Sequence, residues 1–286
     1  MTTQQTAQCT ICASNSTLYM TQGEHPIYVC ESCGHMFALP VGDDHVEDVY
    51  GDDYFFGGGD GYPNYLEEQQ LLVKRGHYYA KKLNKYGTPG RILDVGCAAG
   101  FLLKGFSDHG WEGTGIEPNP AMVEFGKQEL ALDLRQGTLE TFQDQEPFDL
   151  VSMIQVIAHL NDVPGAFKVL QQIIKPGGLL LVETWNQQSY TARMLGQYWH
   201  EYCPPSVLNW FTPQRLSGYL SDYGFTLEGT GRTAKMLSVK HAFTLGCNAV
   251  GLTPPESITH KIPGGWRVPY PSEDLFWAVY RKSESE

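Results

Sequence analysis

The residues whose types and spacing best suit chemistry lie between Ile92 and Phe101, where the sequence reads ILDVGCAAGF. Gly96, Ala98 and Gly100 would let the backbone approach a ligand closely. The helix expected next would present the unpaired N–H groups of its first turn to that ligand. The stretch predicts a nucleotide-binding turn between a buried strand and a helix, with a tight turn that binds nothing as the alternative.

Acidic residues around this turn indicate which nucleotide it binds. Phe101 stands where the G-x-G-x-x-G dinucleotide fingerprint has its third glycine. Asp94 would repel a pyrophosphate but attract the ammonium and sulfonium groups of S-adenosylmethionine. Glu117 ends the next expected strand, 21 residues after Gly96, where a carboxylate can accept both ribose hydroxyls. Either acid alone could be an ordinary surface residue, but both fall at strand ends, which favours S-adenosylmethionine.

Cysteines at the start of the chain form a second pattern. Two C-x-x-C pairs, Cys9 with Cys12 and Cys30 with Cys33, are separated by seventeen residues. Each pair can present two thiolates from a tight turn, and two such turns complete a tetrahedral site for Zn²⁺. Disulfides and a redox pair are the alternatives, and His35 could compete as a ligand. We predict a structural zinc ribbon with short strands between the two pairs.

Composition restricts the class of protein. The chain has 286 residues, of which 42% are hydrophobic, and a net charge of −12. No apolar run approaches the roughly 20 residues of a membrane span, and the first ten residues lack the features of a signal peptide. We therefore expect a cytoplasmic protein. The negative charge opposes binding to nucleic acid and to anionic lipid.

An acidic run separates the cysteine pairs from the glycine-rich turn. It contains no Lys or Arg and is expected to be a solvated loop or an ordered lid over a site for a cationic ligand. Its acids are Asp43, Asp44, Glu47, Asp48, Asp52, Asp53 and Asp60. Asn64 and Glu67 resemble a capping box, which predicts a helix from there to Gly87.

The elements that would position these residues alternate between strand and helix from residue 91 onward. This alternation predicts a doubly wound, mostly parallel α/β sheet. Strands are expected at 91–95, 112–117, 133–137, 148–154, 179–183, 225–229 and 274–282. Helices are expected at 101–109, 120–130, 163–174 and from 213 to about 224. Residues 234–273 show no clear periodicity and are interpreted as an excursion over the site.

With these elements the chain resembles the class I S-adenosylmethionine-dependent methyltransferases. The resemblance implies a seven-stranded sheet whose last strand is antiparallel, with the cofactor over the switch between the first and fourth strands. It implies that Thr138 and Leu139 flank the adenine and that Gln155 lies beside the methionine half. The predicted cofactor residues are Asp94, Gly96, Cys97, Ala98, Gly100, Phe101, Glu117, Pro118, Thr138, Leu139, Gln155 and Val156. Cys97 is interpreted as a packing residue rather than a nucleophile.

The layout is similar to a bacterial group of these enzymes that begins with a zinc ribbon. That group has a Tyr-Phe segment (here Tyr54-Phe55), V-I-E-H-L after the fourth strand and H-x-x-x-P-P-x-H-L-x-x-F after the fifth. This chain has Ala158 in place of the glutamate of the first motif and Val207 in place of the second histidine of the other. His159 and His200 remain as candidates for a general base. His200 could equally be structural, within the aromatic cluster of residues 198–211.

These features predict a methyltransferase that acts on a small molecule, most plausibly at oxygen, such as a natural product or a glycan intermediate. The alternatives are a ribosomal RNA base methyltransferase with a zinc ribbon and a non-catalytic regulatory protein that binds the cofactor. Residues 1–40 are expected to form the ribbon and residues 41–90 a linker or lid with the first helix. Residues 91–286 are expected to form the cofactor-binding domain. The oligomeric state is left open.

Overall fold

A computed structural model gives the fold of the chain. It describes residues 6–42, 46, 49–56, 65–144, 146–233, 235–239, 243, 247, 255–259, 261–263, 266–270 and 273–284. Most of the acidic run, Asn64 of the predicted capping box, and Pro254 and Pro271 of the excursion lie outside these residues. Within the described part, no helix is both long enough and apolar enough to cross a membrane.

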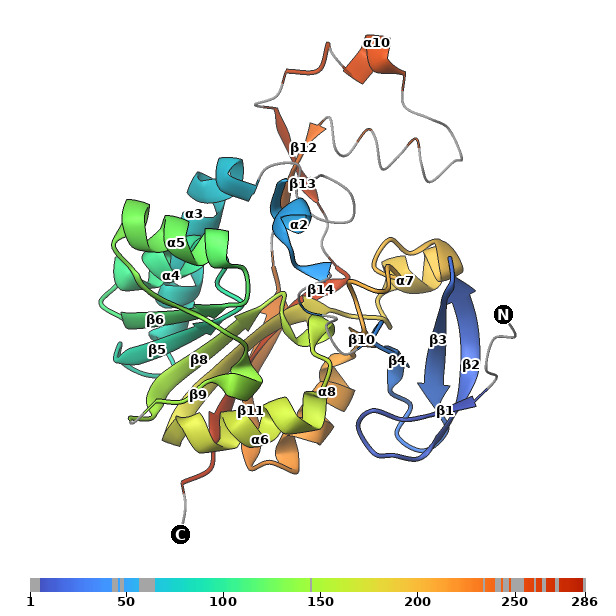
Figure 1. Ribbon diagram of the computed structural model, residues 1–286, viewed down its shortest axis with the longest axis horizontal. Helices are drawn as coiled ribbons and strands as arrows, with labels where there is room; N and C mark the ends of the chain where they lie inside the picture. Colours follow the sequence, from blue (N-terminus) through green and yellow to red (C-terminus); the bar gives the residue numbers. More distant parts are fainter. Residues whose placement is uncertain are drawn as a thin grey trace.

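A seven-stranded sheet forms the centre of the molecule (Figure 1). Its strands are, in spatial order, β11 (Phe225–Arg232), β14 (Leu275–Lys282), β9 (Ile174–Trp185), β8 (Phe148–Ile154), β5 (Arg91–Val95), β6 (Glu112–Glu117) and β7 (Asp133–Gln136). The five strands from β9 to β7 are parallel, and β14 runs antiparallel to both of its neighbours. The predicted mostly parallel sheet with an antiparallel last strand is confirmed.

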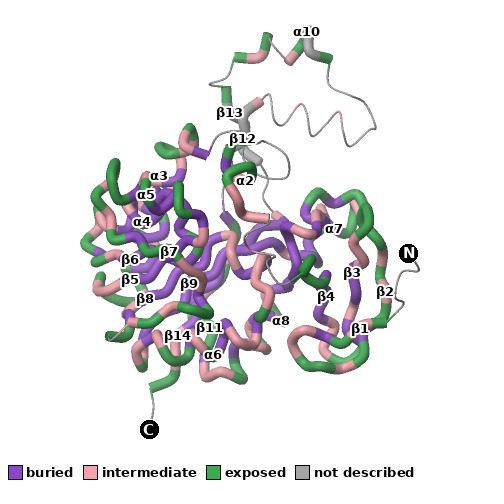
Figure 2. Tube along the Cα trace, in the orientation of Figure 1, coloured by how far each residue is buried: buried purple, intermediate pink, exposed green. Residues whose placement is uncertain are grey.

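Helices cover both faces of this sheet, because alternate residues of each buried strand point to opposite sides. Ile92 packs with α3, α4 and α5, whereas its neighbour Leu93 packs with α6 and α8. Figure 1 shows these two groups on opposite sides of the sheet. The helices are α3 (Gln69–Leu83), α4 (Phe101–Ser107), α5 (Pro120–Leu130), α6 (Val163–Ile173) and α8 (Pro213–Ser221). Figure 2 shows the resulting buried strands between exposed helix faces.

Polar caps fix where three of these helices begin. The side chains of Asn119, Asp162 and Thr212 accept backbone N–H groups of the first turns of α5, α6 and α8 at 2.9–3.1 Å. Each cap is followed by proline in the first turn, where no N–H is needed. The starts of these helices, as predicted from the sequence, are confirmed.

The amino-terminal part forms a second sheet, with the order β1 (Thr6–Gln8), β2 (Asn15–Gln22), β3 (His25–Cys30), β4 (Met36–Ala38) and β10 (Asn209–Trp210). The fifth strand, β10, comes from the part of the chain that contains the seven-stranded sheet, called the large domain below. It pairs antiparallel with β4. The hydrophobic core beneath β4 includes Trp199, Tyr202 and Trp210. The two parts of the chain therefore share both a sheet and a core.

Several elements differ from the sequence predictions. β9 begins at Ile174 rather than 179, because Lys175 to Gly178 bulge out while the residues on either side stay paired with β8. Lys175 Nζ holds this bulge through an ion pair with Asp149 at 2.8 Å. The predicted excursion begins and ends with a two-stranded pair, β12 (Lys235–Ser238) with β13 (Arg267–Tyr270). The division of the chain into three segments stays a prediction.

Candidate cofactor and acceptor site

Backbone geometry explains the small residues of the turn after β5. Gly96 has φ +62° and Gly100 has φ +79°, a region that side chains disfavour. A Cβ on Gly96 would lie 2.7 Å from Val156 Cγ2, so the turn passes close to the end of β8. Ala98 and Gln155 also have positive φ, at +47° and +61°. Such conformations cluster where a fold holds a ligand.

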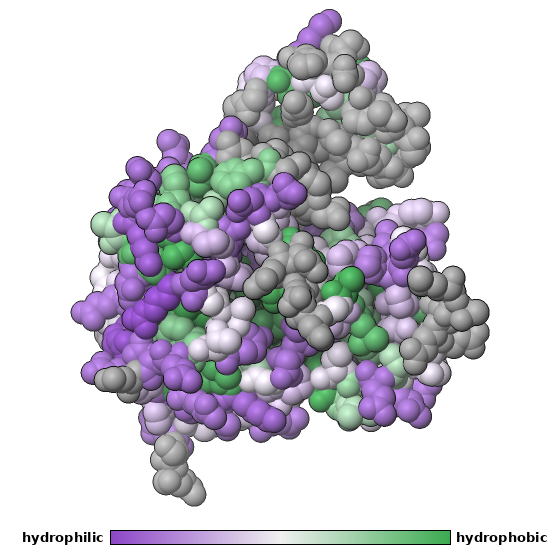
Figure 3. Space-filling model, viewed as in Figure 1, coloured by the Kyte–Doolittle hydropathy of each residue, from purple (hydrophilic) through white to green (hydrophobic). Residues whose placement is uncertain are grey.

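A cavity of about 640 Å³ opens at the carboxyl ends of β5, β6 and β8. Its size is typical of small-molecule sites. Eight of the predicted cofactor residues line it: Gly96, Ala98, Glu117, Pro118, Thr138, Leu139, Gln155 and Val156. Figure 3 shows hydrophilic residues over the outer parts of one face of the molecule and hydrophobic ones toward its middle. The structure thus brings the predicted loops together around one cavity.

Glu117 lies at the end of β6 with its carboxylate held in place. Its Oε2 accepts the Ala98 N–H at 2.9 Å, and its Oε1 accepts the Asn119 N–H at 3.0 Å. Burial raises the pKa of Glu117 to about 6, against the lowering effect of these two hydrogen bonds. The side chain is therefore mostly ionised at neutral pH and can accept hydrogen bonds from hydroxyl groups of a ligand in the cavity.

Asp94 lies below the turn rather than on the cavity surface. Its Oδ1 accepts the Ser152 hydroxyl at 2.6 Å, and its Oδ2 has no hydrogen-bond partner among the described residues. Burial raises the pKa of Asp94 to about 7, with a further contribution from the charge of Glu117. This carboxyl can therefore add negative potential beneath the turn, but its predicted direct contact with the cofactor stays a prediction.

Three other predicted cofactor residues support the turn from behind and are not among the cavity-lining residues. Cys97 packs against β6, where a Cβ on Gly115 would lie 2.6 Å from its sulfur. Burial raises the pKa of this thiol well above its usual value, which agrees with a packing role. Gly100 caps α4, and Phe101 stacks on Tyr65 with ring centroids 5.5 Å apart. Their assignment as cofactor contacts stays a prediction.

A buried polar cluster at the ends of β8 and β9 was missed by the sequence analysis. Glu183 is fully buried and forms an ion pair with Arg75 of α3. It also accepts hydrogen bonds from Gln155 and Thr233, both at 2.9 Å, and from the Tyr79 hydroxyl. Arg75 is the one Lys or Arg among the described residues that line the cavity. No short motif marks such a contact, because Arg75 and Glu183 are 108 residues apart in the sequence.

His159 lies in the short helix η3 (Ile157–His159) and lines the cavity. Its Nδ1 is 2.6 Å from the carbonyl oxygen of Ser206. Because a carbonyl only accepts hydrogen bonds, Nδ1 carries the proton. In the neutral imidazole the lone pair then lies on Nε2. The same carbonyl accepts the Tyr50 hydroxyl at 2.7 Å, and the Tyr50 ring stands edge-on to the imidazole, with centroids 5.7 Å apart.

His200 is placed differently from His159. It is an exposed residue whose Nε2 lies 2.9 Å from Glu201 Oε1 and whose ring lies edge-on to Trp185. Glu201 and Trp185 line the cavity, but His200 is not among its lining residues. Two residues differ from the motifs of the bacterial group described above. Ala158 is buried, and Val207 lines the cavity. The geometry therefore favours His159 over His200 as the residue that meets an acceptor.

A segment before α3 forms part of the cavity wall. The Asn119 side chain donates to Asp52 Oδ1 at 3.0 Å and to the Tyr50 carbonyl at 3.3 Å, which ties the helix α2 (Asp52–Phe56) to the cofactor side. The Tyr50 hydroxyl ties the same segment to the His159 side. Tyr54 and Phe55, the predicted Tyr-Phe segment, follow these attachments and also line the cavity.

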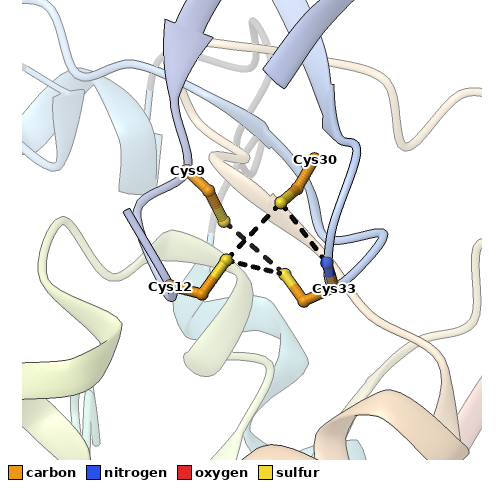
Figure 4. A group of neighbouring side chains, drawn as sticks. All are labelled: Cys9, Cys12, Cys30 and Cys33. Carbon is orange, nitrogen blue, oxygen red and sulfur yellow. Dashed lines mark hydrogen bonds between the residues drawn. The ribbon is translucent and has the colours of Figure 1, made fainter. Parts of the chain in front are cut away.

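The four cysteines of the amino-terminal sheet converge on one point (Figure 4). The sulfur of Cys12 lies 3.5 Å from those of Cys30 and Cys33, and the sulfurs of Cys9 and Cys33 are 3.7 Å apart. Tetrahedral Zn–S bonds of about 2.3 Å give sulfur–sulfur edges of about 3.8 Å, whereas a disulfide bond is about 2.05 Å. The N–H groups of Ile11 and Cys33 donate to the sulfurs of Cys9 and Cys30 at 3.4 Å. Both the spacing and these donors fit a thiolate metal site.

Three features define a class I methyltransferase domain. They are the mostly parallel sheet, the glycine-rich turn after β5 and the acid at the end of β6, Glu117. Residues 66–229 match the family model described as a methyltransferase domain. This match covers more than half of the chain, which therefore belongs to the methyltransferase-domain family, as the resemblance predicted.

Individual proteins agree with this assignment. The chain is 33% identical over 148 residues to a ubiquinone biosynthesis O-methyltransferase of Rhodopseudomonas palustris, an alignment that covers 48% of this chain and 58% of that protein. It thus spans only about half the length of the curated relatives it matches. A methyltransferase structure from Bacillus halodurans superposes with a TM-score of 0.54 at 14% identity, covering 72% of this chain and 98% of that one. An S-adenosylmethionine-dependent methyltransferase from Thermotoga maritima gives 0.50 at 18%, covering 78% and 96%. These two structures support the fold alone.

Proposed function

We propose that the protein transfers a methyl group from S-adenosylmethionine to a hydroxyl oxygen of a small molecule, in the cytoplasm. The observation that carries this proposal is the cavity at the strand ends, which joins the Gly96 turn and Glu117 to His159. The name of the Rhodopseudomonas relative, an O-methyltransferase, supports oxygen as the acceptor atom.

The chemistry of the lining residues fits the parts of this cofactor. Glu117 would accept the ribose hydroxyls, while Thr138 and Leu139 would flank the adenine. The methionine half would lie toward Gly96 and Gln155. Its carboxylate needs a cation, and Arg75 would supply it, as the one Lys or Arg among the described residues that line the cavity. When bound, the cofactor supplies a sulfonium-activated methyl group.

We infer that His159 would take the hydroxyl proton of the acceptor on Nε2 as the acceptor oxygen bonds to the methyl carbon. The cofactor, when bound, would supply that methyl group, and its sulfur would keep the electron pair of the broken carbon–sulfur bond. The Ser206 carbonyl holds the ring in the required tautomer. Proximity and alignment in the cavity can lower the barrier by about 7–11 kcal/mol, while a general base contributes about 10²–10⁴-fold.

The walls around His159 restrict the acceptor. Tyr50, Tyr54 and Trp185 line this end of the cavity, together with the apolar side chains of Leu160 and Val207. Such a wall favours a planar or lipophilic acceptor over a highly charged one. A phenol or a related ring alcohol is therefore the acceptor class that we propose.

The experiment that tests the function has a binding step and a transfer step. Calorimetry should show micromolar binding of the demethylated cofactor S-adenosylhomocysteine, weakened at least about tenfold by Arg75→Met. Transfer of labelled methyl groups should then be measured on a panel of phenols and aliphatic alcohols. If the cofactor does not bind, the proposal fails. Binding without transfer to any alcohol would favour the non-catalytic alternative.

Replacing the two histidines separates their roles. We expect His159→Ala to lower kcat by about 10²–10⁴-fold because the general base is lost. The affinity for S-adenosylhomocysteine should change little, since the cofactor contacts remain. His200→Ala should retain most of the activity. The opposite pattern, with activity lost only in His200→Ala, would contradict the assignment of His159.

We also propose that Cys9, Cys12, Cys30 and Cys33 hold one structural Zn²⁺. Elemental analysis should find about one zinc per chain, and Cys12→Ser together with Cys33→Ser should remove it. Cys247→Ser is the matched control, because Cys247 is not part of the cluster. A protein purified without metal that keeps its full thermal stability would contradict this proposal.

A further inference from the structure

The cysteine ribbon, Thr6 to Ala38, touches the wall of the cavity from outside. None of its described residues lines the cavity itself. It nevertheless packs against the segment that follows β9, through the pairing of β4 with β10. The pairing of β4 with β10 is therefore one route by which the ribbon can affect the reaction.

One side chain, Asn209, connects the ribbon to the turn that carries His159. It is almost fully buried, and its Nδ2 donates to the Leu160 carbonyl at 2.7 Å. Its Oδ1 lies 3.1 Å from Nε2 of His35 in the ribbon. Because the amide oxygen can only accept, Nε2 of His35 is the donor. The amide oxygen of Asn209 thus contacts the ribbon, and its amide nitrogen contacts Leu160, the residue that follows His159.

His35 is held firmly enough to act as a fixed support. The ring is fully buried and lies nearly parallel to Phe37, with an angle of 7° between the two ring planes. Phe211 and Tyr219 of the large domain pack on its other sides. The Tyr219 hydroxyl also donates to the carbonyl of Cys33, which links this support to the cysteine cluster.

Backbone hydrogen bonds run along the same path. The Ala38 N–H donates to the Leu208 carbonyl, and the Leu208 N–H donates to the Ala158 carbonyl, both at 2.9 Å. The chain of contacts therefore runs from β4 through Leu208, the residue before β10, to Ala158, the residue before His159. The Ser206 carbonyl, which sets the tautomer of His159, belongs to the same segment.

We propose that the ribbon is a positioning element for the reaction, and that Asn209 is the positioning residue that holds the His159 turn against it. This inference rests on the proposed function for the role of His159. The ribbon supports the acceptor side of the cavity, because the close contact of Gly96 and the hydrogen bonds of Glu117 lie within the large domain. Its effect on catalysis is therefore separable from cofactor binding.

The test compares Asn209→Leu with the wild-type protein. Leucine has the same branching and the same number of side-chain heavy atoms as asparagine but can form neither hydrogen bond, so the Leu160 carbonyl and His35 lose their partner. Ser217→Ala is the matched control. Ser217 lies in α8, and this change removes its hydrogen bonds to the Pro213 carbonyl and to the Tyr280 hydroxyl of β14.

Three measurements are made on each protein: the tautomer of His159 by ¹⁵N NMR, hydrogen exchange of residues 157–160, and the affinity for S-adenosylhomocysteine. In the wild type we expect the proton on Nδ1. In Asn209→Leu we expect a mixture of tautomers and exchange at 157–160 at least about tenfold faster. The affinity for S-adenosylhomocysteine should stay within about threefold, a change of less than 1 kcal/mol. Ser217→Ala should change neither the tautomer nor the exchange.

Three outcomes overturn the proposal. An unchanged tautomer and unchanged exchange in Asn209→Leu would show that the turn does not depend on this residue. A parallel loss of S-adenosylhomocysteine affinity, or the same changes in Ser217→Ala, would show a general loss of stability instead. A proton on Nε2 in the wild type would contradict the base assignment itself, and with it this inference, while leaving cofactor binding intact.

Discussion

The surroundings of the two acids in the site, more than their residue type, set their pKa values. Asp94 and Glu117 are both acids at strand ends. One oxygen of the buried Asp94 has no hydrogen-bond partner among the described residues, whereas Glu117 accepts two backbone N–H groups. Burial raises the pKa of Asp94 to about 7 and that of Glu117 to about 6. Both groups therefore titrate within the range where an enzyme is assayed.

These pKa values predict a pH dependence of cofactor affinity. A cationic cofactor with ribose hydroxyl donors favours the ionised form of both carboxyls, so binding displaces the protons that they carry at low pH. Affinity should therefore rise by about tenfold or more between pH 5.5 and pH 7.5 and level off above. Calorimetry in buffers of different ionisation enthalpy measures both the affinity and the protons released.

Asp94→Asn provides the control for this pH dependence. It removes the group with the higher pKa, so the rise between pH 6.5 and 7.5 should flatten, while the part that Glu117 causes below pH 6.5 remains. An affinity that falls with pH, or a slope that Asp94→Asn leaves unchanged, would contradict the assignment.

At the scale of elements, two glycines let α3 approach α4 closely enough to deliver Arg75 to the site. A Cβ on Gly76 would lie 2.3 Å from the Leu102 carbonyl oxygen, and one on Gly105 would lie 2.4 Å from that of Val73. These contacts are with backbone atoms, which cannot move aside as a flexible side chain can. The helices therefore cross at this pair of glycines, one residue after Arg75.

Gly76→Ala tests this crossing. We expect the free energy of unfolding to fall by about 1–3 kcal/mol, because the added methyl group overpacks the contact. The affinity for S-adenosylhomocysteine should fall as well, since Arg75 moves with α3. Gly218→Ala, in α8, is the control: no atom lies within 4 Å of the added Cβ, and a gain of about 0.5–1 kcal/mol is expected. If urea unfolding showed that Gly76→Ala and Gly218→Ala raise the free energy of unfolding equally, the close crossing of α3 and α4 would be contradicted.

The whole molecule is organised so that the ribbon and the large domain act as one unit. They share a five-stranded sheet, and the core beneath it contains residues from both. The contacts of the ribbon with the large domain thus give it a structural role that requires no nucleic acid. The net charge of −12 also opposes an RNA partner.

This organisation predicts weak or no binding to RNA. A mobility-shift assay with a structured ribosomal RNA fragment should show no complex at micromolar protein and about 0.1 M salt, because the mean surface potential is negative. A basic RNA-binding domain of similar size serves as the positive control. A complex whose affinity falls steeply with salt would instead favour the RNA methyltransferase alternative.

Much of the site follows from the sequence because its determinants are local. Strand periodicity, the small residues of the Gly96 turn, and the caps at Asn119 and Asp162 each depend on residues within a few positions. They place the cofactor side of the cavity at the ends of β5 and β6. The spacing of the cysteine pairs likewise predicts their convergence.

The acceptor side was decided by the tertiary structure. Arg75 meets Glu183, Tyr50 and His159 meet at the Ser206 carbonyl, and Asn209 joins His35 to Leu160. Each of these contacts joins residues far apart in the chain and depends on how whole elements pack, so no local pattern marks it. The sequence by itself therefore determined the fold and the methyl donor, whereas only the packing of ribbon, helix and sheet decided which histidine lines the cavity.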